Sequence, residues 1–116
     1  MSETYELFQQ GRRHLASGYA AQATVALEKA KRREPGKASI REALGIAYFR
    51  IQRFREAEAE FRAVLELAPA DDYAHFALAR SLDKQGRHRE ATPHYKLARC
   101  LRPGREEYRT VDRPTG

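Results

Sequence analysis

Small and large side chains recur along this chain with a period of 34 residues. Its clearest marker is a proline, at Pro35, Pro69 and Pro103. When the chain is divided into residues 4–37, 38–71 and 72–105, each proline falls at repeat position 32, and the residue classes before it recur in phase. Because one helical hairpin cannot bury its apolar face alone, a period of this length predicts several stacked copies of a hairpin.

Four further repeat positions keep their residue size in all three copies. They are Gly11, Gly45 and Ala79 at position 8; Ala23, Ala57 and Ala91 at position 20; Leu27, Phe61 and Tyr95 at position 24; and Ala30, Val64 and Ala98 at position 27. Small residues at positions 8 and 20 allow two helices to cross closely, and the bulky residue at position 24 fills the space beside the crossing. Each copy is therefore expected to be a closely packed helix pair.

This arrangement resembles the tetratricopeptide repeat (TPR) family over residues 4–105 of 116. The departures are Gln10 at position 7, His14 at position 11, and Arg41 and His75 at position 4. The resemblance implies an all-α fold, a right-handed α-solenoid of three helix-turn-helix repeats. We expect residues 1–105 to form this domain, and residues 106–116 to form a short capping helix stub and a disordered tail.

Helices are expected over residues 4–17, 20–33, 38–51, 54–67, 72–85 and 88–101, with turns at Gly18, at Gln52 and Arg53, and at Gly86. Glycine suits a helix C-terminus, where a left-handed backbone is favoured. Asp71 or Asp72 can cap the fifth helix by accepting from its free amides.

The two ends of the repeat array differ. Positions 3, 7 and 10 face the preceding repeat, and they hold Glu6, Gln10 and Arg13 in the first copy, which predicts a polar N-terminal cap. At the other end, Tyr108 and Val111 continue the pattern briefly. We expect them to cover Leu97 and Leu101 in part, and self-association through this end is a further hypothesis.

The composition indicates the cellular compartment in which the protein is expected. The chain has one cysteine, Cys100, so an internal disulfide is impossible. It has no long apolar run, and its first residues resemble neither a signal nor a transit peptide. We therefore expect a cytoplasmic protein. The net charge is +6, and arginine outnumbers lysine, which fits either carboxylate recognition or a GC-rich genome.

The sequence shows no pattern typical of catalysis. The four histidines form no pair at i and i+4, the glycines form no phosphate-binding loop, and the serines lie in no nucleophile elbow. Packing is the favoured explanation for His14 and His75. We therefore expect no enzyme, no metal site and no cofactor.

The TPR resemblance implies that positions 2, 5, 6, 9, 12 and 13 form a concave inner wall. The residues there that we expect to bind a partner are Tyr5, Phe8, Arg12, Ile46, Phe49, Arg50, Tyr73, Phe76, Arg80 and Lys84. Tyrosine, phenylalanine and arginine are enriched where interface energy concentrates. The hypothesis is a scaffold or adaptor whose groove binds a peptide segment with apolar anchors and acidic or C-terminal carboxylate groups.

One TPR subgroup grips the carboxylates of Hsp70 and Hsp90 tails with a clamp of lysine, asparagine and arginine. The positions of that clamp hold Phe8, Arg12, Ala43, Tyr73 and Ala77 in this chain. The clamp is therefore missing, and any grip on a carboxylate must use other residues.

Nucleic-acid binding is the alternative, through basic surfaces on the second helix of the first and third repeats. The residues concerned are Lys29, Lys31, Arg32, Arg33, Lys96, Arg99 and Arg102. Against it, Glu56, Glu58 and Glu60 lie between the two basic clusters. A subunit that only regulates an enzyme would show the same pattern as an adaptor.

Overall fold

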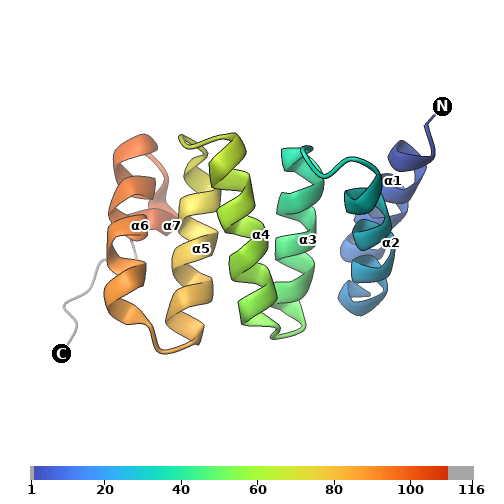
Figure 1. Cartoon of the computed structure of the whole chain (residues 1–116). Coiled ribbons are helices and arrows are strands. Elements are labelled where there is room, and N and C mark those ends of the chain that lie inside the picture. The colour runs from blue at the N-terminus through green and yellow to red at the C-terminus, as the bar shows by residue number, and fades with distance from the viewer. Residues whose placement is uncertain (1, 110–116) are drawn as a thin grey trace.

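The computed structural model describes residues 2–109, and all of the regular structure in that range is helical. The helices are α1 (Glu3–Ala16), α2 (Ala20–Arg33), α3 (Ala38–Arg50), α4 (Phe54–Leu67), α5 (Asp72–Lys84), α6 (His88–Leu101) and α7 (Glu106–Arg109). The six predicted helices are confirmed to within one residue at each end. Figure 1 shows three antiparallel pairs, α1–α2, α3–α4 and α5–α6, standing side by side in chain order.

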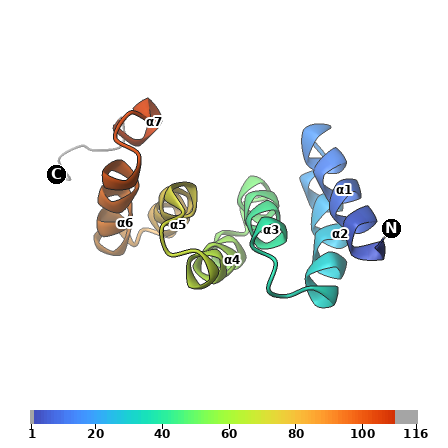
Figure 2. The same ribbon diagram turned by 90° about the horizontal axis from the view of Figure 1, so that it is seen from above.

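The pairs follow an arc, which Figure 2 shows from above. Helices α3 and α5 lie on the inner side, α4 on the outer side, and α1 and α7 stand at the two ends of the hollow. The α-solenoid prediction is confirmed, and its concave face is formed by the first helix of each repeat.

Repeat position 15 has a left-handed backbone in all three copies. The φ angles are +83° at Gly18, +77° at Gly86 and +64° at Gln52. Glycine adopts this conformation freely, whereas a glutamine there carries a steric cost. The predicted cap of α5 is also confirmed, because the Asp71 side chain accepts a hydrogen bond from the amide of Ala74 at 3.0 Å.

In the first two repeats, the close crossing of the two helices leaves no room for a side chain at position 8. A Cβ atom added at Gly45 would lie 2.8 Å from the Phe61 ring, and one added at Gly11 would lie 2.5 Å from Cγ of Leu27. The position 24 residue therefore fills the space that glycine leaves, as the size pattern predicted.

The two ends of the array are closed differently. Glu6, Gln10 and Arg13 are exposed, which confirms the polar outer face of the first repeat. At the other end, the ring of Tyr108 is fully buried against Phe76, with ring centroids 4.8 Å apart.

Leu97 and Leu101, which this end was expected to cover in part, are 43% and 41% exposed. Helix α7 turns toward the concave side, and its Tyr108 packs on α5, where the hydroxyl donates to Asp72 and the ring meets Phe76. Val111, the other residue expected to contribute, lies outside the described residues. Self-association through this end stays a prediction.

Candidate binding groove

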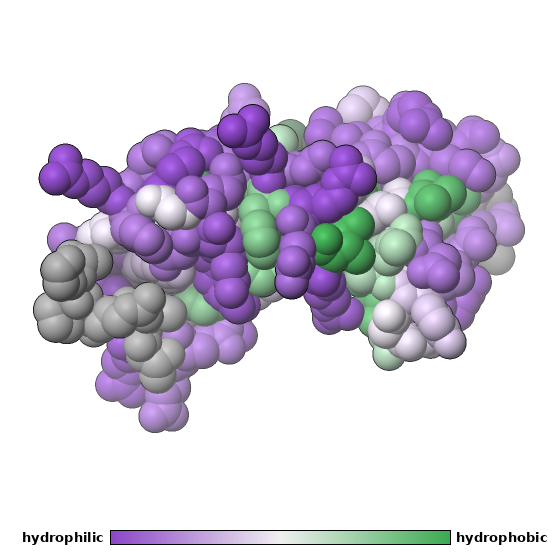
Figure 3. Space-filling view, turned by 90° about the horizontal axis from the view of Figure 1, so that it is seen from below, coloured by the Kyte–Doolittle hydropathy of each residue, from purple (hydrophilic) through white to green (hydrophobic). Residues whose placement is uncertain are grey.

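A cavity of about 300 Å³ opens on the concave face between α3 and α5. Its lining residues are Ile46, Phe49, Arg50, Phe61, Tyr73, Phe76, Ala77 and Arg80. Six of the ten residues predicted for the groove are in this set, and we name the cavity the α3–α5 pocket. Figure 3 shows hydrophobic residues in the middle of the molecule, amid a mostly hydrophilic surface.

Aromatic contacts fix the walls of the α3–α5 pocket. Phe61 and Tyr73 meet edge to face, with ring centroids 6.4 Å apart. The ring of Phe76 packs against those of Tyr95 and Tyr108, with centroid distances of 5.9 Å and 4.8 Å. Because such pairs add to the stabilisation from burial, the walls are formed before any partner arrives.

Arg80 lies at the mouth of the pocket with an exposed side chain. Its guanidinium carbon is 4.8 Å from the ring centroid of Phe49 and 5.9 Å from that of Phe76. Stacking on two rings orients the cation while leaving its hydrogen-bond donors in reach of a partner.

Arg50 is committed partly to the fold. Its Nη1 atom donates to the carbonyl oxygen of Leu15 at 2.9 Å, at the C-terminal end of α1. It therefore joins the first two repeats across the groove, and only its remaining donors can face a partner.

Four predicted residues do not line the α3–α5 pocket. Tyr5, Phe8 and Arg12 lie on α1, where Arg12 stacks over Phe8 at 5.6 Å and Tyr5 is 51% exposed. Lys84 lies at the last residue of α5 and is exposed. That these four residues also face a partner on the concave side stays a prediction.

Sequence reasoning missed two features of the site. Phe61 was assigned to the core by its repeat position, yet its ring also forms part of the pocket wall. Glu42 lies one helical turn before Ile46 on the same face of α3, where burial together with Asp71 and Asp72 raises the pKa of its carboxyl. Glu42 stands at repeat position 5, which is one of the inner-wall positions. Its sequence neighbours, however, do not show that its carboxyl has no hydrogen-bond or ion-pair partner among the described residues.

Arg41 and His75, which depart from the TPR pattern at position 4, have one structural role in common. Nε of Arg41 donates to the carbonyl of Pro35 at 2.9 Å, and Nε2 of His75 lies 2.8 Å from the carbonyl of Pro69. A polar residue at position 4 therefore satisfies the backbone at position 32. The position is structural in both repeats, and His75 is buried.

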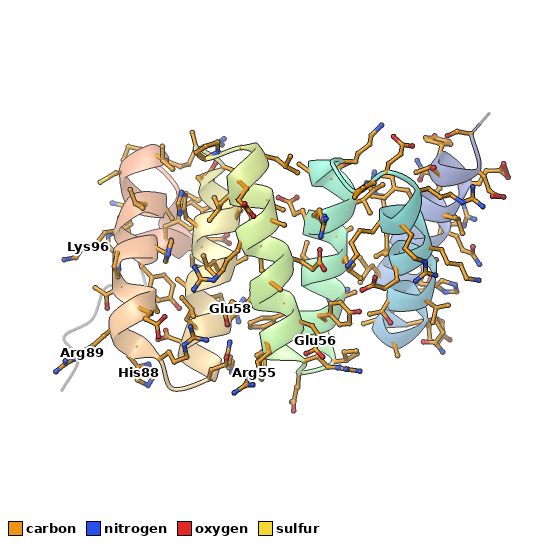
Figure 4. The ribbon with its side chains drawn as sticks, in the orientation of Figure 1. Arg55, Glu56, Glu58, His88, Arg89 and Lys96 are labelled. Carbon is orange, nitrogen blue, oxygen red and sulfur yellow. The ribbon has the colours of Figure 1, made fainter. Side chains whose placement is uncertain are left out.

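The basic residues considered for nucleic-acid binding are partly engaged within the protein. Lys31 contacts Glu60 at 2.9 Å, Arg33 pairs with Glu3, and Arg102 lies 3.6 Å from Asp72. On the outer helices, Figure 4 shows Glu56 and Glu58 beside Arg55 on α4, with His88, Arg89 and Lys96 on α6. The outer surface therefore mixes both signs of charge.

Within residues 2–109, no group of three or more histidine, cysteine, aspartate or glutamate side chains is placed to hold a metal ion. No helix in the same range is both long and apolar enough to cross a membrane.

Comparison with known proteins matches the family described as tetratricopeptide repeat at residues 7–71 and 42–106. No curated protein matches the chain in sequence. Among solved structures, MamA of AMB-1 is 31% identical with a TM-score of 0.84, and the match covers 90% of this chain and 62% of MamA. The chain thus spans about three fifths of that relative.

Two TPR units of Spaghetti (RPAP3), each bound to the HSP90 peptide SRMEEVD, share the fold. The first has a TM-score of 0.88 at 19% identity, covering 93% of this chain and 86% of that one. The second has a TM-score of 0.82 at 17% identity, covering 86% and 93%. With its 34-residue period, its glycine-lined helix crossings and the family match over most of its length, this chain belongs to the tetratricopeptide repeat family.

Proposed function

We propose that this protein is a non-enzymatic scaffold or adaptor whose concave groove binds a segment of a partner protein. The observation that carries the proposal is the preformed α3–α5 pocket, with aromatic walls and an oriented arginine at its mouth. In this proposal residues 1–105 form the binding domain, and the stub that follows closes its core.

The pocket has the size and chemistry of an anchor site. A volume of about 300 Å³ suits one or two large side chains of a partner rather than a long stretch of chain. Large apolar anchors in desolvated pockets supply most of the energy of an interface. Arg80 can add a charge-assisted hydrogen bond to a carboxylate beside the anchor.

The peptide-bound RPAP3 units support the idea that this fold can hold a peptide. They do not supply the residues, because the clamp positions hold Phe8, Arg12, Ala43, Tyr73 and Ala77 in this chain. Any grip on a carboxylate would come from Arg80, with help from Arg12 and the free donors of Arg50.

Nucleic-acid binding through the outer helices has less support. Lys31, Arg33 and Arg102 are already paired with carboxylates, which would have to be displaced by phosphates. The groove proposal needs no internal contact to break.

Affinity purification from the source cells tests the proposal, with the wild type beside Arg80→Glu and the control Arg89→Glu. Both variants make the same change of charge, but Arg89 lies on the outer helix α6 (Figure 4). We expect partners to be retained by the wild type and by Arg89→Glu, and lost by Arg80→Glu. A partner retained equally by all three proteins would contradict the assignment of the groove.

A further inference from the structure

Glu42 is a carboxylate of the groove without a partner of its own. It is half-buried on the concave side of α3, and within residues 2–109 it makes no hydrogen bond and no ion pair. Burial and the nearby carboxylates of Asp71 and Asp72 all disfavour its ionised form. The fold therefore gains nothing from a negative charge at this position.

The two neighbouring aspartates differ from Glu42 because the fold uses both of them. Asp71 caps α5 through the amide of Ala74. Asp72 accepts a hydrogen bond of 2.6 Å from the hydroxyl of Tyr108. Both also lie at the N-terminal end of α5, where the helix dipole favours a negative charge. Glu42 is the fifth residue of α3, beyond the reach of that effect.

Opposite charges border the α3–α5 pocket at its two ends along the helices. On α3, Glu42 lies one turn before Ile46 and Arg50 lies one turn after it. On α5, Arg80 lies one turn after Phe76. We call the Glu42 end the acidic edge and the arginine end the basic edge.

Glu42 and Glu107 raise the pKa of the Tyr73 hydroxyl in addition to burial, while Arg80 and Arg50 lower it. One tyrosine side chain in the pocket wall is thus within electrostatic range of both an acidic and a basic edge. The sequence-based expectation considered only the basic edge.

We propose that the partner segment carries a lysine or arginine beside its apolar anchor, and that Glu42 receives this cation while the anchor fills the α3–α5 pocket. This inference depends on the proposed function, and it adds the direction in which the bound segment runs along the groove. With an acid on the Arg80 side and a base on the Glu42 side, the segment can bind in one direction only, because reversal would place like charges together.

A stability measurement tests whether Glu42 serves the fold or a partner. Glu42→Gln should unfold in urea at the same midpoint as the wild type or at a higher one, because it removes an unpaired, repelled charge. The control is Glu66→Gln, at an exposed position of α4. A Glu42→Gln protein that unfolds at a clearly lower midpoint than the control would show a structural role and overturn the inference.

A binding measurement uses synthetic peptide pools with a central phenylalanine and charges three residues away on each side. One pool has lysine before and glutamate after the phenylalanine, one has the reverse order, and two have the same charge on both sides. Binding is followed by the resonance shifts of the protein's backbone amides. We expect one mixed pool to bind about fivefold more tightly than either same-charge pool.

The variants distinguish failure of the inference from failure of the proposed function. In Glu42→Gln, the advantage of the best mixed pool over the pool with two glutamates should shrink, whereas Glu66→Gln should keep it. Pools that shift the pocket resonances equally, whatever their flanking charges, would overturn the inference and leave groove binding intact. If no pool shifts those resonances, both the inference and the groove assignment are contradicted.

Discussion

The second and third repeats place the same helix pair around different side chains, and the differences separate what the fold requires from what it tolerates. In the second repeat, Arg41 at position 4 faces Glu60 at position 23 at 3.2 Å. In the third, the same positions hold His75 and His94, whose Nδ1 atoms are 3.0 Å apart. Both residues at position 4 bond the carbonyl of the proline that ends the preceding repeat, while the residue at position 23 differs in charge between the two repeats.

The two pairs differ in charge and in connection. Glu60 is buried and accepts from both Arg41 and Lys31, so it ties the second repeat to the first. The histidine pair shares one hydrogen bond between its Nδ1 atoms. If Nε2 of His75 donates to the Pro69 carbonyl, its Nδ1 must accept from Nδ1–H of His94. The stability of the second repeat should therefore fall when the Glu60 charge is removed, and that of the third repeat should fall when a histidine of the pair gains a proton.

The largest effect is expected from Glu60→Ala. It removes the carboxylate that Arg41 and Lys31 share, although Lys31 keeps its contact with Glu28 at 3.1 Å, and we expect a loss of about 3 kcal/mol in the free energy of unfolding. Urea unfolding measures it, with Glu66→Ala as the control. A loss no larger than that of the control would mean that water replaces the carboxylate at no cost.

The next effect is a loss of stability in acid that comes from the third repeat. Burial, the neighbouring His75 and Arg62 on α4 lower the pKa of His94 below its model-peptide value of 6.5. The unfolded chain therefore binds a proton at higher pH than the folded one does. The contribution of His94 is complete above pH 6.5 and is lost as the pH falls below it.

The melting temperature between pH 7.5 and pH 5 measures this effect. In His94→Gln the decrease over that range should be smaller than in the wild type, because the group that titrates is gone. A variant at the exposed His88 serves as the control for simple loss of a histidine. An unchanged decrease in His94→Gln would assign the acid sensitivity to other groups.

A smaller effect is expected at position 8, where the repeats differ by one methyl group. Gly45→Ala should cost about 1–2 kcal/mol, because the new Cβ would lie 2.8 Å from the rigid Phe61 ring and outweigh the gain in helix propensity. Ala79→Gly in the third repeat should cost about 1 kcal/mol from helix propensity. Thermal unfolding of both variants would show whether the crossings differ in tightness, and a stabilised Gly45→Ala would contradict the steric argument.

The smallest effect is a gain at position 15. Gln52 has φ +64°, where the first and third repeats have Gly18 and Gly86. Gln52→Gly should raise the free energy of unfolding by about 0.5 kcal/mol, the relief of strain less the added chain entropy. The midpoint of urea unfolding would detect it, and Gln22→Gly, within α2, should lower the midpoint instead.

Much of the fold could be predicted because each step depended on nearby residues. The size pattern at positions 8, 20 and 24 placed the helix crossings, and Gly18 and Gly86 marked turns between helices. The candidate site was predicted in part, since repeat position identified six of the pocket residues. Glu42 was not singled out, because the carboxylates that repel it, Asp71 and Asp72, lie about 30 residues further along the chain and are brought near it only by the fold.

The sequence by itself determined the period, the helices and the face of each helix that turns inward, because helix geometry links residues three and four apart wherever the chain lies. Only the tertiary structure decided which charges border the pocket, that Arg50 bonds Leu15, and that Tyr108 seals Phe76 and leaves Leu97 exposed. These contacts join residues of different repeats, so they depend on how much each repeat rotates against the next. That rotation is the sum of packing at every interface and is not encoded at any one position.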